Sequence, residues 1–319
     1  MIKLRTVSFL LAMLVAVCVL LPAFAAGNDD AAEYVEETVV PEEPVVEPEV
    51  EEEIAEPVPT SPFYVNGVNL PEMEYVQIKN TVYVAVASFV MAVDGNAVVE
   101  ELDGMISVSA VSILENAVAE GDGSTFLEET LSLTAEIGDC YVCANGRYLY
   151  LEDGVSSIEG KVALPIHILA RIFNLNLEWV DGVAQMNGIE GAGAYIECGD
   201  TYYDEEILYW LSRIIFSESG NQSMLGQLAV GNVVMNRLNA PGFPNTIKGV
   251  LFQKNQFSPA MSGSIYRTPG PASVIAAKLV MDGAVVLENA LFFNRAGMNT
   301  FASRNRTHVA TIGAHAFFA

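Results

Sequence analysis

The chain has 319 residues, which is enough for two or three domains rather than one small core. Its formal net charge of -25 is uneven, because residues 1–200 hold 34 of the 40 acidic and 6 of the 15 basic side chains. Residues 201–319 hold 9 basic and 6 acidic side chains, a net charge of +3 with histidines neutral. These basic residues are scattered singly, which argues against a nucleic-acid partner but allows contact with another anionic polymer.

The N-terminus has the pattern of a secretory signal peptide. Lys3 and Arg5 precede an apolar run over residues 7–21, and Ala23 and Ala25 supply an A-x-A cleavage site. We therefore predict a signal peptide over residues 1–25 and a secreted protein. A retained membrane anchor is the alternative, although the run is short for a span, and no later segment could span a membrane. A lipid anchor at Cys18 is disfavoured, because a valine precedes that cysteine.

Residues 26–61 predict an acidic, proline- and glutamate-rich disordered linker. Between residues 29 and 61 there are 13 acidic side chains and no lysine or arginine. Like charges and prolines keep such a segment extended and leave too little apolar surface for a core. Cation binding by its glutamates is a weaker alternative.

Residues 62–195 predict a duplicated α/β domain. Each half has a strand, an Asn-Gly turn (Asn66-Gly67 or Asn145-Gly146), a second strand, a short apolar helix and a closing strand. Residues 83–86 and 163–166 correspond at a spacing of 80 residues. A glycine-rich linker, residues 190–199, follows this region.

This pattern resembles the stalk module that is similar to the copper amine oxidase N-terminal domain, found in secreted proteins of Gram-positive bacteria. The resemblance implies surface attachment or spacing. It does not imply copper, because His167 is the only histidine in the region and cannot alone form a metal site.

Three cysteines follow the signal peptide: Cys140, Cys143 and Cys198. The C-x-x-C pair lacks a second pair or a nearby histidine, so neither a redox motif nor a metal site is favoured. One disulfide with a free thiol, or three reduced buried thiols, are the two alternatives.

Residues 201–319 predict a small, mainly helical domain. Asp204 opens a first helix, and a second runs from about Met224 to Leu238, with small residues that would let another helix approach. Thr246 caps a short helix, and Pro271 begins a longer one through about Leu287.

Glu218 is the carboxylate of this domain without a ready structural role. Asp204, Glu205 and Glu206 stabilise a helix N-terminus, and Asp282 and Glu288 are interpreted as solvated. Glu218 follows an apolar helix face, where desolvation would raise its pKa and keep it protonated, as a general acid requires. A solvent-exposed glutamate at the end of a helix is the alternative.

Several other catalytic classes are disfavoured by the motifs. The chain has no G-x-S-x-G or H-E-x-x-H motif and no cysteine after Cys198. His308 and His315 lack the third ligand that zinc catalysis requires, so we expect no metal and no cofactor. His308 is interpreted as a substrate contact or a structural hydrogen-bond partner.

Six short motifs follow one another in this region: SESGN at 217–221, GQLAV at 226–230, VVMNR at 233–237, FPNTIKGV at 243–250, QFSP at 256–259 and ALFF at 290–293. In this order they resemble the catalytic domain of the spore cortex-lytic enzyme family of cell-wall hydrolases, over about residues 205–318. The resemblance implies a lysozyme- or lytic-transglycosylase-like fold, a peptidoglycan substrate and Glu218 as the catalytic acid. Asn221 and Ser217 depart from the family pattern, which usually has an acidic residue and an alanine there.

The sequence thus predicts a multidomain α+β protein in which duplicated stalk modules precede a mainly α catalytic domain over residues 201–319. We expect it to cleave peptidoglycan glycan strands outside the cell, at the cell wall or the spore, with wall attachment through the stalk repeats. Because no second carboxylate lies near Glu218 in sequence, a single-glutamate lytic transglycosylase is favoured. Alternatives are a non-catalytic wall-binding protein and an N-acetylmuramoyl-L-alanine amidase. The substrate-contact candidates are Gln256, Phe257, Ser258, Tyr266, Asn294 and Asn236. For Phe257 and Phe293 a core role is an equal alternative to sugar stacking, and Asn236 could instead cap or buttress its helix.

Overall fold

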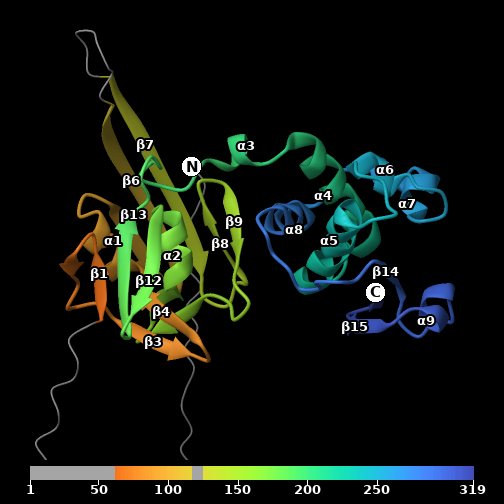
Figure 1. Cartoon of the computed structure of the whole chain (residues 1–319), viewed down its shortest axis with the longest axis horizontal. Helices are drawn as coiled ribbons and strands as arrows, with labels where there is room; N and C mark the ends of the chain where they lie inside the picture. The colour runs from red at the N-terminus through yellow and green to blue at the C-terminus, as the bar shows by residue number, and fades with distance from the viewer. Residues whose placement is uncertain (1–61, 117–124) are drawn as a thin grey trace, which may run out of the picture. The chain divides into compact units, whose positions relative to one another are not determined.

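A computed structural model describes residues 62–116 and 125–319 (Figure 1). The predicted signal peptide, the predicted acidic linker and Cys18 lie outside the described residues. All described residues belong to one compact unit, Pro57–Ala319. Within the described part, no helix is long and apolar enough to cross a membrane.

The N-terminal part of this unit is built from three sheets and two short helices. One sheet has the order β12 (Leu175–Val180), β13 (Val183–Gly188), β1 (Phe63–Val65), β2 (Val68–Asn69). A second has the order β10 (Ser156–Ile158), β11 (Lys161–Pro165), β4 (Thr81–Ala85), β3 (Tyr75–Ile78). The third has the order β5 (Val98–Leu102), β6 (Met105–Asn116), β7 (Thr125–Glu136), β8 (Tyr141–Ala144), β9 (Arg147–Tyr150). Helices α1 (Val86–Val93) and α2 (Ile166–Ile172) contribute the fully buried Phe89 and Leu169 to a shared core.

Both predicted Asn-Gly turns are confirmed. Asn66 and Gly67 join β1 to β2, and Asn145 and Gly146 join β8 to β9, in antiparallel pairs. All four residues have positive φ, from 48° to 78°, as a two-residue turn between twisted strands requires. Asparagine and glycine tolerate this conformation best, which explains why the dipeptide marks both hairpins.

The segments that the sequence aligns as repeats are neighbours in the fold. β4 and β11 pair antiparallel, with Val84 opposite Leu164. The residue before Val84 therefore lies opposite the residue after Leu164, and the residue after Val84 lies opposite the residue before Leu164. Each strand leads directly into a helix, α1 or α2. The duplication itself stays a prediction, because this pairing describes two strands and not two whole modules.

The long hairpin formed by β6 and β7 was not predicted. Its register pairs Met105 with Glu136 and continues to Asn116 opposite Thr125. Alternating burial at Ile106, Val108 and Ala110 gives the strand one apolar face against the core. The alternation was present in the sequence and could have identified the strand.

The three thiols are all free: Cys140 and Cys143 are half-buried and Cys198 is exposed. The predicted burial was therefore wrong for Cys198. It lies in the segment that leads into α3 (Gly199–Tyr202), outside the core.

The C-terminal part begins with helices whose caps were predicted correctly. In α4 (Glu205–Ser219), the Asp204 carboxylate accepts a hydrogen bond from the Ile207 amide at 2.8 Å. In α6 (Ile247–Leu251), the Thr246 hydroxyl accepts one from the Gly249 amide at 3.2 Å. Each cap satisfies an amide that the helix itself leaves unpaired.

Helices α4, α5 (Met224–Asn239) and α8 (Pro271–Met281) pack side by side around a second core (Figure 1). Gly231 of α5 permits this approach, because a Cβ there would lie 2.9 Å from Val280 Cγ2 and 3.0 Å from Ile215 Cδ1. The predicted close approach of helices is confirmed at this glycine.

Helix α8 ends earlier than predicted, at Met281 rather than about Leu287. Gly283 has a φ of +100°. The amide of Ala284 donates a hydrogen bond to the Leu279 carbonyl, and the amide of Gly283 donates one to the Val280 carbonyl. These two bonds form a Schellman motif, which closes a helix over a left-handed glycine. Gly283 was the signal in the sequence.

The description of this part as mainly helical missed a sheet. Strands β14 (Phe292–Arg295), β16 (His315–Phe318) and β15 (His308–Ile312) form it in that order. Two short helices, α7 (Ser258–Ser262) and α9 (Phe301–Asn305), and a 3-10 turn at Ser264–Tyr266 complete the region. The strands have four or five residues each, too few for a clear alternation in sequence.

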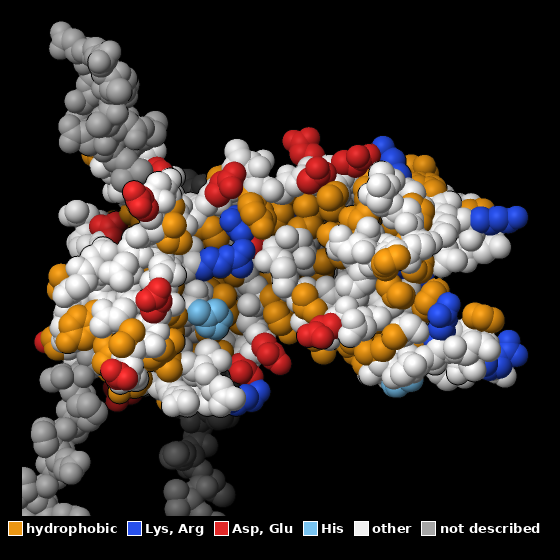
Figure 2. Space-filling model, in the orientation of Figure 1, with side chains coloured by type: hydrophobic (Ala, Val, Ile, Leu, Met, Phe, Trp, Pro, Cys, Tyr) orange, Lys and Arg blue, Asp and Glu red, His pale blue; other side chains and the backbone are white. Residues whose placement is uncertain are grey.

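Basic side chains over α5 to α9 stand at separate points of the face shown in Figure 2 rather than in one stripe. This agrees with their scattered positions in the sequence.

Candidate active site

A cavity of about 690 Å³ opens in the C-terminal part, and α4, α5, α7, β14 and β16 all contribute to it. Its lining contains one carboxylate, several amide and hydroxyl groups, and aromatic rings. The lining residues are Glu218, Arg237, Asn255, Gln256, Phe257, Ser258, Met261, Ser262, Phe293, Asn294, Arg295 and His315.

Glu218 is the penultimate residue of α4 and reaches this cavity from the end of the helix. The helix closes with Gly220 in right-handed conformation, where a Cβ would lie 2.6 Å from the Phe216 carbonyl oxygen. Ser223 is the N-cap of α5, so the new helix starts only a few residues after α4 ends. The chain therefore turns directly after Glu218. This local geometry places the carboxyl beside the core rather than in open solvent.

The Glu218 carboxyl is half-buried and has no hydrogen-bond or ion-pair partner among the described residues. Burial raises its pKa from the ordinary 4.5 to about 7. Removal of water disfavours the charged form, and this desolvation is the cause of the raised pKa. The predicted desolvation is confirmed, and the carboxyl can both donate and accept a proton near neutral pH.

Four of the six predicted substrate-contact residues line the same cavity: Gln256, Phe257, Ser258 and Asn294. Phe257 also belongs to the core and is only 1% exposed, as its core alternative predicted, whereas its contact with substrate stays a prediction. Ser258 begins α7, and Pro259 follows at a position where a helix tolerates proline.

The other two candidates lie outside the lining. Asn236 donates from its amide to the Leu287 and Ala290 carbonyls, both at 3.1 Å, and thereby fastens the segment after α8. Tyr266 is 59% exposed and packs edge-on against Trp210, with ring centroids 5.9 Å apart. Asn236 is thus a buttress, which was the alternative reading.

The sequence did not single out Arg237, Asn255 or His315 as site residues. Arg237 was noted only as part of the VVMNR motif, and His315 only as a histidine of the C-terminal tail. Neither was predicted to line the site. His308, interpreted as a substrate contact or a structural partner, bonds Thr311 Oγ1 through Nε2 at 2.9 Å and does not line the cavity.

Arg237 is a buried cation in the cavity wall. It is 3% exposed, and its Nε donates to the Leu291 carbonyl at 2.6 Å. Its guanidinium carbon lies 4.8 Å from the ring centroid of Phe257 and 5.3 Å from those of Phe243 and Phe292. Burial lowers its pKa to about 10, so it stays charged at neutral pH.

His315 and Asn294 form another part of the wall. The His315 ring meets Phe293 edge-on at 5.3 Å, and burial lowers the pKa of the imidazole, which is therefore neutral at pH 7. Asn294 donates to Thr300 Oγ1 at 2.5 Å. His315 Nδ1 and Asn294 Oδ1 are buried and have no partner within the described residues.

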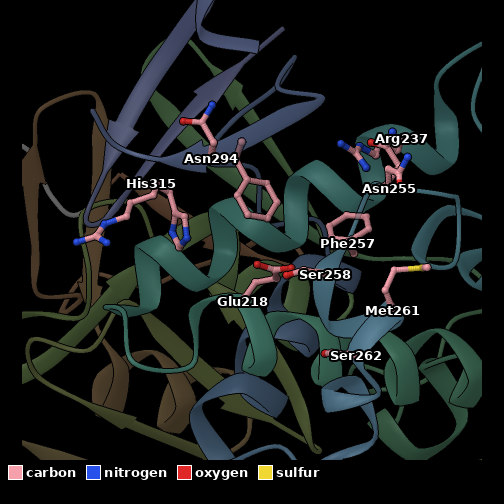
Figure 3. Close-up of a pocket in the computed structure, with 12 residues that line it drawn as sticks. Glu218, Arg237, Asn255, Phe257, Ser258, Met261, Ser262, Asn294 and His315 are labelled. Atoms are coloured by element: carbon pink, nitrogen blue, oxygen red, sulfur yellow. The ribbon is translucent and has the colours of Figure 1, made fainter. Parts of the chain in front are cut away.

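Figure 3 shows the Glu218 carboxyl between these two groups: His315 and Asn294 lie on one side, and Arg237, Asn255 and Phe257 on the other. The carboxyl thus lies in a cavity with polar and aromatic groups on both sides.

No group of three His, Cys, Asp or Glu side chains in residues 62–116 and 125–319 is placed to hold a metal ion.

The C-terminal part is similar to known proteins. Residues 221–318 match the model of the family described as Cell Wall Hydrolase, a range that begins just after Glu218. The spore cortex-lytic enzyme of Bacillus cereus is 31% identical over 116 residues, which are 36% of this chain and 45% of that protein. The spore cortex-lytic enzyme of Bacillus subtilis (strain 168) is 32% identical over 108 residues, 34% of this chain and 35% of that protein.

Two solved structures are also similar. The catalytic domain of the Bacillus cereus SleB protein is 30% identical, with a TM-score of 0.35 over 37% of this chain and 92% of that one. The catalytic domain of the germination-specific lytic transglycosylase SleB from Bacillus anthracis is 29% identical, with a TM-score of 0.35 over 37% of this chain and 97% of that one. This chain spans less than half the length of the curated relatives it matches. Residues 221–318 thus match the Cell Wall Hydrolase family model, and the C-terminal part is similar in sequence to spore cortex-lytic enzymes.

Proposed function

We propose that this protein cleaves the glycan strands of peptidoglycan as a lytic transglycosylase, with Glu218 as its only acid–base residue. The observation that carries this proposal is the state of Glu218: a half-buried carboxyl with a pKa of about 7 that has no partner, and no second carboxylate beside it in the cavity, among the residues that the structure describes. The names of the relatives, spore cortex-lytic enzymes, support peptidoglycan as the substrate.

The proposed reaction uses one carboxyl group twice, first as an acid and then as a base. The protonated Glu218 gives its proton to the glycosidic oxygen as the bond from that oxygen to the muramoyl C1 breaks. The resulting Glu218 carboxylate then takes the proton of the muramoyl 6-hydroxyl, whose oxygen bonds to C1. A 1,6-anhydro ring forms, water is not consumed, and Glu218 ends in its starting state.

The lining of the cavity favours this route over ordinary two-carboxylate hydrolysis. Retaining and inverting glycosidases place a second carboxylate within about 5 to 10 Å of the first. Glu218 is the one carboxylate among the lining residues that the structure describes. With a pKa of about 7, a single group can serve as acid and then as base at neutral pH.

The side chains around Glu218 would hold the glycan. Gln256, Ser258 and Asn294 offer amide and hydroxyl groups for sugar hydroxyls, and the half-buried Phe293 offers an aromatic face. For the N-terminal sheets we propose a spacing or wall-attachment role, which rests on the resemblance of their sequence to stalk modules.

Product analysis separates this proposal from its alternatives. Purified vegetative wall and spore cortex fragments are incubated with the protein, and the soluble products are identified by mass spectrometry. We expect muropeptides that end in 1,6-anhydro-muramic acid. Reducing ends would indicate hydrolysis, free peptides would indicate an amidase, and no product would indicate a non-catalytic wall-binding protein.

A further inference from the structure

Arg237 is a charged group without a counter-ion. No carboxylate bonds to it within the described residues, and its Nη1 is fully buried without any hydrogen-bond partner. A buried charge is costly unless it is paired and hydrogen-bonded. The single bond to the Leu291 carbonyl and three aromatic faces account for part of its stabilisation only.

A purely structural role for Arg237 accounts for the hydrogen bond that Nε donates, but it gives the two terminal nitrogens of the guanidinium no acceptor among the described residues. Nε fastens the start of β14, whereas the terminal nitrogens have no partner that the structure describes. Because Arg237 lines the cavity of Glu218, a ligand in that cavity can supply the missing acceptor. Guanidinium groups bind carboxylates in preference to sugar hydroxyls, because they donate two parallel hydrogen bonds to the two carboxylate oxygens. The carbonyl oxygen of an acyl group can accept a single charge-assisted hydrogen bond from the same cation.

We propose that Arg237 is a specificity-determining residue that binds the acyl oxygen of the 3-O-lactyl group of a muramoyl unit. This inference rests on the proposed function, which makes a muramoyl glycan the substrate. The lactyl group is what distinguishes a muramoyl unit from an N-acetylglucosaminyl unit. Arg237 would therefore make the cavity select peptidoglycan over chitin, and a free lactyl carboxylate would bind most tightly.

Binding to the Glu218→Gln protein tests this without turnover. The first probe is a peptide-free tetrasaccharide of alternating N-acetylglucosamine and N-acetylmuramic acid, with free lactyl carboxylates. The second is chitin tetraose, which has the same length and no lactyl group. We expect the muramoyl probe to bind about tenfold or more tightly than chitin tetraose, as buried charge-assisted hydrogen bonds produce. Additional Arg237→Met substitution should bring the two affinities within about twofold, and Arg237→Lys should restore part of the difference.

Arg213→Met is the matched control. Arg213 also stacks on an aromatic ring, 3.6 Å from the centroid of Tyr209, but does not line the cavity. Its substitution should leave the ratio of the two affinities unchanged. Equal affinities in the Glu218→Gln protein, or an unchanged ratio after Arg237→Met, would overturn the proposal.

A chemical change in the ligand avoids any dependence on variant folding. Converting the lactyl carboxylates to methylamides removes their charge and keeps the carbonyl oxygen. We expect an affinity for the Glu218→Gln protein between those of the two probes, and an affinity equal to that of the free carboxylate would contradict the charge argument. Cleavage by the wild-type protein is measured separately, so selective binding without any glycan cleavage would refute the proposed function and not the role of Arg237.

Discussion

Asp282 accepts two hydrogen bonds from Arg147, one from Nε at 3.0 Å and one from Nη2 at 2.7 Å, although 135 residues separate them. Arg171 and the Tyr203 hydroxyl bond the same carboxylate. The interpretation of Asp282 as a solvated helix-end residue was therefore wrong, since its side chain is only 1% exposed. The carboxylate joins strand β9 to the end of helix α8, and the sequence could not pair residues so far apart.

Asp282→Asn should lower the free energy of unfolding by about 3 kcal/mol, because removal of one partner leaves buried arginine charge unpaired. Urea denaturation followed by circular dichroism measures this. Glu288→Gln is the control, since Glu288 is exposed and has no hydrogen-bond or ion-pair partner among the described residues, and its effect should stay within about 0.5 kcal/mol. Equal stability of the two variants would show that the ion cluster contributes little.

Gly231→Val should destabilise the packing of α5 against α4 and α8 by about 1 to 3 kcal/mol. The first side-chain carbon would already lie within 3.0 Å of Ile215 and Val280, so the helices must separate. Gly231→Ala should cost less, because better helix propensity offsets part of the overlap. Thermal melts of both variants provide the comparison, and a Gly231→Val protein as stable as wild type would refute the close contact.

The stability of the protein should depend on pH through Glu218. Because its pKa is raised from 4.5 to about 7 in the folded state, its contribution is fully present below pH 4.5 and is lost as pH rises through about 7. The difference in unfolding free energy between wild type and Glu218→Gln should therefore change by roughly 3 kcal/mol across that window, in favour of the variant at high pH. A difference that is constant from pH 4 to pH 8 would mean that Glu218 is not desolvated.

The rate of glycan cleavage should fall above about pH 7, by about tenfold for each further pH unit, because the reaction begins with protonated Glu218. Initial rates at saturating substrate across pH 5 to 9 measure this limb. Substrate binding to Glu218→Gln provides the control and should show no such limb. A decline that begins near pH 4.5 would indicate an exposed carboxyl of ordinary pKa.

Local chemistry made much of the fold predictable. Asp204, Thr246 and the two Asn-Gly turns act on neighbouring backbone groups, so their roles could be inferred from short segments. The end of α8 was missed although Gly283 signalled it, and the short strands β14 to β16 gave too little alternation for recognition. These strands obtain their pairing from each other rather than from a local pattern.

The candidate site was only partly predictable. The position of Glu218 could be inferred because a carboxylate directly after an apolar helix face is unusual. The segment from Gln256 to Ser258 could be inferred because it belongs to a motif that resembles the family. Arg237 and His315 enter the cavity from α5 and β16, and only the tertiary fold brings them to Glu218. The same fold directs Asn236 to the carbonyls after α8 instead of to the cavity.

The central claim is that Glu218 is the acid of glycan cleavage, and the turnover number of Glu218→Gln on purified peptidoglycan strands tests it most directly. Glutamine keeps the shape of the side chain and cannot transfer the proton, so we predict a fall in kcat of about 10²- to 10⁴-fold with little change in strand binding. Glu288→Gln, which removes an exposed carboxylate outside the cavity, should retain activity. A Glu218→Gln protein that releases 1,6-anhydro products at the wild-type rate would contradict the assignment.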